Sequence, residues 1–427
     1  MYRLDEELGA ICGRGFSPKG EKWESGEFVV GGALMESSLL HTSASVPAES
    51  FAPLGLFEVF LMNCSRRSFV KGMVASVGAT SFLGAGSQAM AEGESMESKK
   101  PIPGKGGDIY VPYDKRTGTE SFVWFTRDLS RDGLRNIYEK VAKSISGKVA
   151  IKLHTGEKNG PNIIPRDWVQ DLIERDLPGA AIVETNAYYQ GDRYTTEQHR
   201  ETLRVNGWNF APVDILDETG TAMLPVKGGK WFTEMAVGKN LLNYNSLVVL
   251  THFKGHVMGG FGGSAKNIGI GCADGRIGKA MIHTREGEGQ WSISGEEFME
   301  RMTESAKAVV DHFAPHIVFI NVLRNMSVSC DCEGVAAQPV VTPNIGIVAS
   351  LDILACDQAS VDLVHALPEK DRAALFERMS SRHGFRQLSY MKEMGMGNDR
   401  YQLLDVDFSD KRIAPRDAVA DVKPFVN

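Results

Sequence analysis

The feature that most constrains the fold is an alternation of helix-like segments with short, continuously apolar runs. Residues 131–145 carry apolar side chains at helical spacing and precede the β-rich run 148–154. The same helix-then-strand pattern recurs in three pairs of segments: 166–177 with 180–185, 195–207 with 211–216, and 294–313 with 316–323. Two further apolar runs occur at 246–253 and 345–353, and a further helix-like segment at 357–367. Ser294 and Glu297 predict a capping box at the start of one helix. Strands that are apolar on both faces are typical of parallel sheets covered by helices, so we expect an α/β fold, mainly parallel, with two subdomains as an option.

Polar residues follow several of these apolar runs. His154 and Glu157 come after the first strand, Glu184 and Asn186 after the second, and His252 directly ends the run that begins at residue 246. In open parallel sheets, ligand sites lie at the carboxyl ends of the strands. We therefore expect these side chains to meet at one edge of the sheet.

Composition and charge exclude some kinds of partner. The chain has 427 residues, of which 42% are hydrophobic and 24% charged, and the formal net charge of -7 is spread without long basic runs. This argues against nucleic acid or an anionic membrane surface as a main partner. Beyond residue 100, no run approaches the roughly 18 apolar residues of a transmembrane helix.

The N-terminal part resembles a twin-arginine export signal. Arg66 and Arg67 stand in "SRRSFVK", a weakly apolar Gly/Ala-rich run follows at 72–86, and "AMA" ends at Ala91. We expect a signal peptide at 62–91, handled by the twin-arginine translocation machinery, and export to the periplasm without stable membrane insertion. Such signals belong at a true N-terminus. Residues 1–61 are therefore interpreted as an extension that results from a start codon assigned too far upstream, with Met62 as the true initiator. A polar, Pro/Gly-rich linker is predicted at 92–107.

The export route bears on function, because twin-arginine export carries proteins that are already folded, often with a cofactor inserted. A metal or a metal-containing cofactor (nickel, zinc or iron) is therefore favoured, and an iron–sulfur cluster is the weaker option.

Residues 252–283 hold three histidines, three lysines, one cysteine and nine glycines in 32 positions. The glycines match neither phosphate-binding fingerprint, but they permit positive φ angles and close approach of backbone N–H groups to a ligand. A glycine-rich loop is expected here rather than a helix. Neutral imidazoles suit borderline metals, and lysines neutralise phosphate or carboxylate. The predicted metal ligands are His252, His256, His283, Cys330 and Cys332.

Other residues complete the candidate site. Anchoring of a cofactor or an anion is assigned to Lys254, Gly262, Gly263, Lys266, Asn267 and Lys279, and the predicted catalytic groups are His154, Glu157 and Lys266. Glu184, Arg193 and His199 are weaker acid/base or carboxylate-binding candidates, for which helix caps and surface polarity are an equal explanation.

Four cysteines follow the targeting segment: Cys272, Cys330, Cys332 and Cys356. Two disulfides, a metal site and buried free thiols all remain open, with a slight preference for ligands. No C-x-x-C-x-x-C run for an iron–sulfur cluster is present.

The segments "KLHTGE", "ETNAYYQGDRYTTEQH", "HFKGHVMGGFGGSAKNIGIG", "INVLRNMSVSCDCE" and "IGIVASLDILACDQASVDLV" resemble a family known as domain of unknown function 362, over about residues 108–407. Residues 408–427 are then expected to be a tail. Some members carry a ferredoxin-like segment, which this chain lacks. His256, Lys266 and His283 also follow an order and spacing similar to nickel-dependent lactate racemases, in which such residues hold a nickel–pincer nucleotide. The acidic and arginine motif of that enzyme is not evident here.

These observations favour an exported enzyme that binds a metal or a metal-containing cofactor and acts on a small anionic substrate. Racemisation or another proton abstraction is compatible with them. An iron–sulfur or thiol redox protein and a non-catalytic periplasmic anion-binding protein are the alternatives.

Overall fold

The computed structural model describes residues 109–425, all of which belong to one compact unit. The predicted upstream extension, signal peptide and linker lie outside these residues. No helix within them is both long and apolar enough to cross a membrane.

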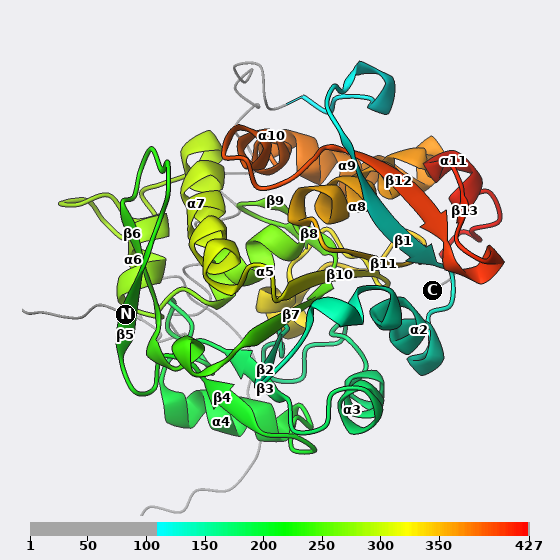
Figure 1. Cartoon of the computed structure of the whole chain (residues 1–427). Coiled ribbons are helices and arrows are strands. Elements are labelled where there is room, and N and C mark those ends of the chain that lie inside the picture. The colour runs from blue at the N-terminus through cyan, green and yellow to red at the C-terminus, as the bar shows by residue number, and fades with distance from the viewer. Residues whose placement is uncertain (1–108, 426–427) are drawn as a thin grey trace, which may run out of the picture. The chain divides into compact units, whose positions relative to one another are not determined.

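A nine-stranded sheet forms the centre of this unit (Figure 1). Its order is β13-β12-β1-β11-β10-β7-β2-β3-β4. The strands are β1 Glu120–Thr126, β2 Val149–Lys152, β3 Ala181–Glu184, β4 Val213–Ile215, β7 Ser246–His252, β10 Ile317–Leu323, β11 Gly346–Ser350, β12 Arg400–Asp405 and β13 Lys411–Arg412. β11 runs antiparallel to β1 and β10, β13 runs antiparallel to β12, and every other neighbouring pair is parallel. The predicted mainly parallel α/β sheet is confirmed.

Two small antiparallel sheets stand beside the large one. β5 (Thr221–Pro225) pairs with β6 (Glu234–Gly238), and β8 (Lys254–His256) pairs with β9 (Gly260–Gly262). The stretch expected to be a glycine-rich loop therefore begins as a tight hairpin and continues as two helices.

Helices cover both faces of the large sheet (Figure 1). One face packs against α2 Arg131–Val141, α3 Arg166–Arg175 and α4 Thr196–Val205. The other packs against α5 Ser264–Gly271, α6 Ile277–His283, α7 Gly295–Phe313, α8 Ile353–Ala366, α9 Glu369–Ser381, α10 Arg386–Glu393 and α11 Pro415–Ala418.

The continuous apolar runs have a simple cause in this layering. In β7, Leu247 and Val249 enter one hydrophobic core, whereas Val248 and Leu250 enter the other. Successive side chains of a strand point to opposite faces, so a strand covered on both sides must be apolar at every position. Each such buried side chain contributes about 1.5–3 kcal/mol.

The predicted capping box is not formed. Ser294 is the N-cap residue of α7, but its side chain makes no capping hydrogen bond. The Glu297 carboxylate is held instead by the guanidinium groups of Arg285 and Arg301. Two charged partners outcompete the single backbone N–H that a capping box would offer.

The C-terminal residues differ from an expected tail. β13 extends the sheet beside β12, and Ala418 and Val419 at the end of α11 are buried in the larger core. Residues up to 425 therefore belong to the same unit.

Candidate functional site

A cavity of about 790 Å³ lies beyond the carboxyl ends of the parallel strands. Strands β2, β3, β7 and β10 run in the same direction, so the residues that follow them meet at one edge of the sheet. Of the residues proposed from sequence, the cavity is lined by His154, Glu157, His252, Lys254, His256, Gly262, Gly263, Lys266, Asn267, Lys279, His283 and Cys332. The structure thus brings most of the candidates together.

The segment between β10 and β11 supplies the two sulfur atoms. Because β11 runs antiparallel to β10, Gly346 starts opposite Leu323, and the connection stays at the edge where the cavity lies. A 3-10 helix, η4 (Asp331–Ala336), begins in it. The Cys330 sulfur accepts a hydrogen bond from the backbone N–H of Cys332 at 3.4 Å.

His256 completes a group with the two sulfurs. One ligand atom from each of His256, Cys330 and Cys332 lies within 4.8 Å of the other two. Within residues 109–425, this is the one group of three or more histidine, cysteine or acidic side chains that is close enough to hold a metal ion.

The hairpin β8–β9 positions His256, and a glycine makes this possible. The Gly255 N–H donates to the Ser327 carbonyl at 2.8 Å. A Cβ at Gly255 would lie 2.3 Å from the Val328 carbonyl oxygen. Only glycine lets the hairpin approach the cysteine segment this closely.

Hydrogen bonds to the backbone decide where each histidine of the cavity carries its proton. His256 Nδ1 accepts from the N–H groups of Met258 and Gly259, at 3.2 and 2.8 Å. A neutral imidazole has one N–H, so His256 presents Nε2–H toward the sulfurs. His154 has the same arrangement, since its Nδ1 accepts from the Gly156 N–H at 2.8 Å.

His283 has the opposite arrangement. Its Nδ1 lies 2.8 Å from the Lys279 carbonyl oxygen, which only accepts, so Nδ1 donates and Nε2 keeps a free lone pair. Burial lowers the pKa of His154 and His283 to about 3 and that of His256 to about 4, which keeps all three rings neutral near pH 7.

His252 differs from the other predicted ligands. Its Nδ1 faces the Asp331 carboxylate at 2.9 Å, and its Nε2 faces the Arg324 carbonyl oxygen at 2.6 Å. Both ring nitrogens point at acceptors, so neither offers a lone pair to a metal in this arrangement. Lys254 binds the same carboxylate at 2.8 Å. Although burial raises the pKa of Asp331, His252 and Lys254 hold it well below its usual range.

The pKa values of the two thiols are shifted in opposite directions. Burial raises the pKa of the Cys330 thiol, but the hydrogen bond with Cys332, the charge of Lys266 and the contact with His256 together bring it well below its usual range. The hydrogen bond with Cys330 and burial raise the pKa of Cys332. Of the pair, Cys330 therefore ionises more readily than Cys332.

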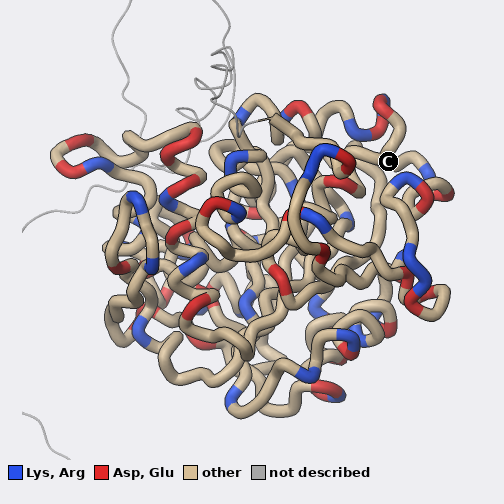
Figure 2. The backbone as a smooth tube through the Cα atoms, turned by 45° about the horizontal axis from the view of Figure 1, so that its top comes forward, with Lys and Arg blue, Asp and Glu red and all other residues tan. Residues whose placement is uncertain are grey.

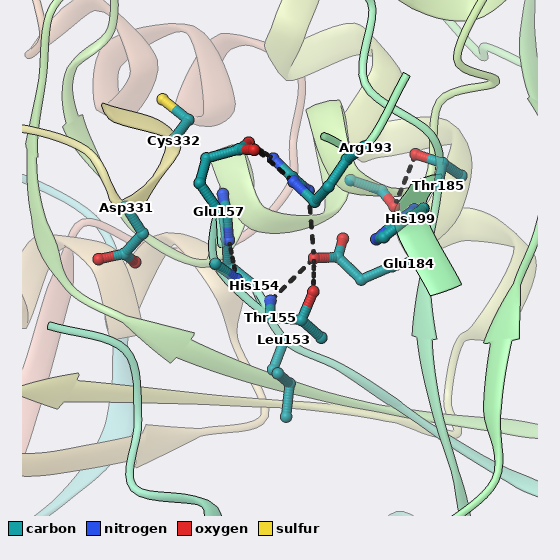
Figure 3. Close-up of polar contacts among 12 residues, drawn as sticks. Leu153, His154, Thr155, Glu157, Glu184, Thr185, Arg193, His199, Asp331 and Cys332 are labelled. Carbon is teal, nitrogen blue, oxygen red and sulfur yellow. Dashed lines mark hydrogen bonds and ion pairs between the residues drawn. The ribbon is translucent and has the colours of Figure 1, made fainter. Parts of the chain in front are cut away.

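Three cations of the cavity are already paired with carboxylates. Lys152 lies 2.9 Å from Glu184, Lys254 binds Asp331, and Arg193 lies 2.7 Å from Glu157 and 3.7 Å from Glu184. Figure 3 shows Arg193 between the two glutamates, with Thr155 donating to Glu184 from below. Glu157 also accepts from the Tyr189 hydroxyl, so this predicted catalytic carboxylate is firmly held.

Lys266 and Lys279 remain without an acidic partner. Neither forms an ion pair with a carboxylate of the described chain. The Lys279 amine donates to the Thr185 hydroxyl at 2.9 Å and to the Asn186 carbonyl oxygen. Burial lowers the pKa of Lys279 to about 8. Among the lysines that line the cavity, these two are left to bind an added anion.

The glycine-rich turn before α5 acts differently from a phosphate-binding loop. The backbone N–H groups of Ser264 and Ala265 donate to the Asp357 carboxylate at 2.7 and 2.9 Å. A Cβ at Gly263 would lie 2.5 Å from the same carboxylate. The amides at the start of α5 are therefore occupied by Asp357.

Gly262 and Asn267, which were predicted to bind a cofactor, have roles in packing and in joining elements of the fold. A Cβ at Gly262 would lie 3.3 Å from the Lys266 side chain. The Asn267 amide donates to the carbonyl oxygens of Lys152 and Leu250 at 3.1 and 3.2 Å, so Asn267 joins α5 to two strands.

The remaining cysteines lie apart from the sulfur pair. Cys272 and Cys356 are fully buried in the larger hydrophobic core, and all four described cysteines are free. The four-sulfur group that an iron–sulfur cluster would require is not formed among the described residues. Of the weaker candidates, His199 is buried with Nδ1 3.3 Å from the Asn186 side-chain oxygen.

Sequence patterns did not identify Lys152, Asp331, or the aromatic side chains of Tyr188 and Trp291, all of which belong to the site or line the cavity. A charged residue inside the apolar run "VAIKL" was a usable signal, because a lysine there must be buried and paired. Asp331 stands between the two cysteines, and its role depends on contacts with β7 and β8 that no local pattern reveals.

Comparisons with known proteins place the chain in a family. A lactate racemase apoprotein from Thermoanaerobacterium thermosaccharolyticum is similar at 10% identity and a TM-score of 0.32, over 70% of this chain and 85% of that one. A protein from Thermotoga maritima is similar at 12% identity and a TM-score of 0.27, over 46% of this chain and 51% of that one. No curated protein matches. The family model described as "Domain of unknown function (DUF362)" matches residues 149–362, half of the chain and a narrower span than 108–407. This span contains every residue that lines the cavity except Arg378, and the chain belongs to the DUF362 family.

Proposed function

We propose that this protein is an enzyme that holds a soft or borderline metal ion, or a cofactor containing one, on Cys330 and Cys332, and acts on a small anionic substrate. The observation that carries this proposal is the His256–Cys330–Cys332 group, which stands beside a cavity with two lysines free of acidic partners. Thiolates favour zinc, nickel and iron among the metals available to proteins.

The metal-binding role falls on the sulfurs rather than on the His256 ring. A metal-bound histidine normally donates its other N–H to an acceptor. His256 has the reverse arrangement, because Nδ1 already accepts from two backbone N–H groups. His256 would therefore donate Nε2–H toward the sulfurs and stabilise their negative charge. Additional ligands would come from the substrate, water or the cofactor.

The cavity also contains groups for proton transfer. His154 carries a proton on Nε2, and His283 has a free lone pair on Nε2. Both line the cavity. A donor and an acceptor in one enclosed site support proton abstraction next to a carboxylate, of which racemisation is one example. Lys266 would bind the anionic group.

Export by the twin-arginine route is part of the same proposal. It is supported by the order of Arg66–Arg67, the apolar run and Ala91 in the sequence. Insertion of the metal before export would fit that route. Fusion of residues 62–91 to a reporter that folds before export would test it, with Arg66→Lys and Arg67→Lys together as the inactive control.

Metal analysis of the full-length chain, produced in the cytoplasm and purified without oxygen, tests the function. We expect about one equivalent of nickel, zinc or iron, without matching sulfide, as for a mononuclear thiolate site. The double variant Cys330→Ser/Cys332→Ser should lose the metal, whereas Cys272→Ala, which removes a buried core thiol, should retain it. Iron with matching sulfide would favour the redox alternative. Absence of metal would leave the anion-binding alternative.

A further inference from the structure

We infer that the substrate or cofactor carries a planar aromatic ring together with its anionic group, and that Tyr188, His283 and Trp291 form the subsite for this ring. The inference rests on the proposed anion-binding role of the cavity and adds the chemical class of the ligand. It is carried by three observations: the aromatic wall, a strained backbone at Trp291, and the position of Lys279.

Three rings from separate segments gather at one wall of the cavity. The His283 ring lies 5.9 Å from the Tyr188 ring, at an interplanar angle of 27°, and 4.9 Å from the Trp291 ring. The Tyr188 and Trp291 rings are 5.2 Å apart. All three line the cavity, and Tyr188 and Trp291 remain partly exposed. Flat ring faces next to open volume are suited to stacking.

The backbone holds Trp291 in an unfavourable conformation. Its φ is 70°, a region that bulky side chains rarely adopt. The surrounding loop enforces this conformation: the Ile293 N–H donates to the His283 carbonyl at 3.2 Å, and the Arg285 N–H donates to the Ser292 hydroxyl at 2.9 Å. Strain of this kind persists where the surroundings fix it, and it gathers at ligand sites.

Hydrogen bonds also hold Tyr188, on the other side of the aromatic wall, in place. The Tyr188 hydroxyl lies 3.0 Å from the Thr284 hydroxyl, and the Gln290 amide donates to the Tyr188 carbonyl at 3.2 Å. These bonds join the segment after β3 to the segment after α6. The rings are thus preorganised, and little conformational entropy is lost when a ligand ring stacks on them.

A cation stands beside the rings. Lys279 and His283 are four residues apart in α6, so they lie on the same face of the helix, and both line the cavity. The Lys279 amine contacts only neutral oxygens in the described chain. A ligand with an anionic group attached to an aromatic ring would satisfy Lys279 and the aromatic wall together.

Calorimetric titration of the full-length chain with benzoate, cyclohexanecarboxylate and acetate tests the inference. The first two carry the same charge, but only benzoate is planar. Stacking should make benzoate bind about tenfold more tightly than cyclohexanecarboxylate, and acetate should bind most weakly.

Variants test whether a preference for benzoate over cyclohexanecarboxylate arises from the aromatic wall. Trp291→Leu keeps an apolar side chain and should remove the preference, whereas Trp124→Leu, a half-buried tryptophan on β1 outside the cavity, should retain it. Trp291→Gly should also remove the preference while raising Tm, because glycine accepts a positive φ without strain.

Equal affinities for the two ring acids, no binding of benzoate, or a preference that survives Trp291→Gly would overturn the inference. Metal content of the same samples separates the two proposals. A benzoate preference in a metal-free chain overturns only the metal site, and a metal-loaded chain without the preference overturns only the aromatic subsite.

Discussion

The Nε2 atom of His256 lies 3.9 Å from the Cys332 sulfur, while the Nδ1 atom of the same ring accepts a backbone N–H from Gly259. The ring is therefore oriented to donate to sulfur. This relationship separates two roles that the sequence cannot distinguish: a metal ligand and a hydrogen-bond donor to the ligands.

The first prediction concerns His256→Gln. A glutamine amide can still donate toward the sulfurs, so the metal should be retained with an affinity about 10–100-fold lower, as is typical when an outer-shell partner of a metal ligand changes. Competition with a chelator measures this. If His256→Gln lost the metal as completely as Cys330→Ser, the ring would be a ligand itself.

Removal of the Glu184 charge should destabilise the sheet edge. Glu184 accepts from Lys152 and from the Thr155 N–H at 2.9 Å each, and its side chain is almost fully buried. Glu184→Gln leaves the buried Lys152 amine without its counter-charge, which costs about 3–5 kcal/mol of unfolding free energy. Urea unfolding tests it, with Glu201→Gln in the exposed Arg204–Glu201 pair as the control that should leave the midpoint unchanged. Equal midpoints for the two variants would contradict the assigned role.

Gly255→Ala should separate the hairpin from the cysteine segment. The added methyl group would meet the Val328 backbone, so β8 must shift and carry His256 with it. We expect a loss of about 1–3 kcal/mol, as for overpacked sites, together with weaker metal binding. Gly289→Ala is the matched control, since no atom lies within 4 Å of its added Cβ. Retention of full metal affinity in Gly255→Ala would show that this close approach does not position the site.

Stability of the metal-free chain should fall as the pH decreases from about 6.5 toward 4. Burial lowers the pKa of His154, His199 and His283 to about 3 and that of His256 to about 4. The unfolded chain binds these protons near pH 6.5 and the folded chain does not, so each histidine lowers the unfolding free energy by up to about 1.4 kcal/mol per pH unit in that window. Urea titrations at pH 7, 6 and 5 measure the slope. His199→Gln should reduce this slope by the contribution of one titrating histidine. An unfolding free energy that does not change with pH would refute the neutral state of the buried histidines.

Much of the fold was predictable because the layers of the sheet impose a local pattern. Strands β2, β3, β7 and β10 lie within two residues of the apolar runs that predicted them, since burial on both faces leaves no other composition. The reversal of β11 was not predictable. A buried strand has the same apolar composition in either direction, and its direction depends on the connection at residues 324–345.

The site was predictable in its location but not in its pairing. His154 and Cys332 were expected near one edge of the sheet because they follow strands, and both line the cavity; Lys266, chosen from the glycine-rich stretch, lines it from α5. Tertiary contacts decide which cation is neutralised. The Asp331 carboxylate pairs with both His252 and Lys254, whereas Lys266 has no carboxylate partner in the described chain. The proton positions of the histidines likewise depend on backbone groups of the folded chain.

X-ray absorption at the edge of the bound metal tests the central claim most directly, with the full-length chain and its Cys330→Ser/Cys332→Ser variant measured under the same metal loading. The assignment of Cys330 and Cys332 as ligands predicts two sulfur neighbours at about 2.3 Å in the parent chain, the distance typical of zinc–thiolate bonds, and their loss in the variant. A shell of nitrogen and oxygen alone, a sulfur shell that survives the double substitution, or a chain without any metal would contradict it.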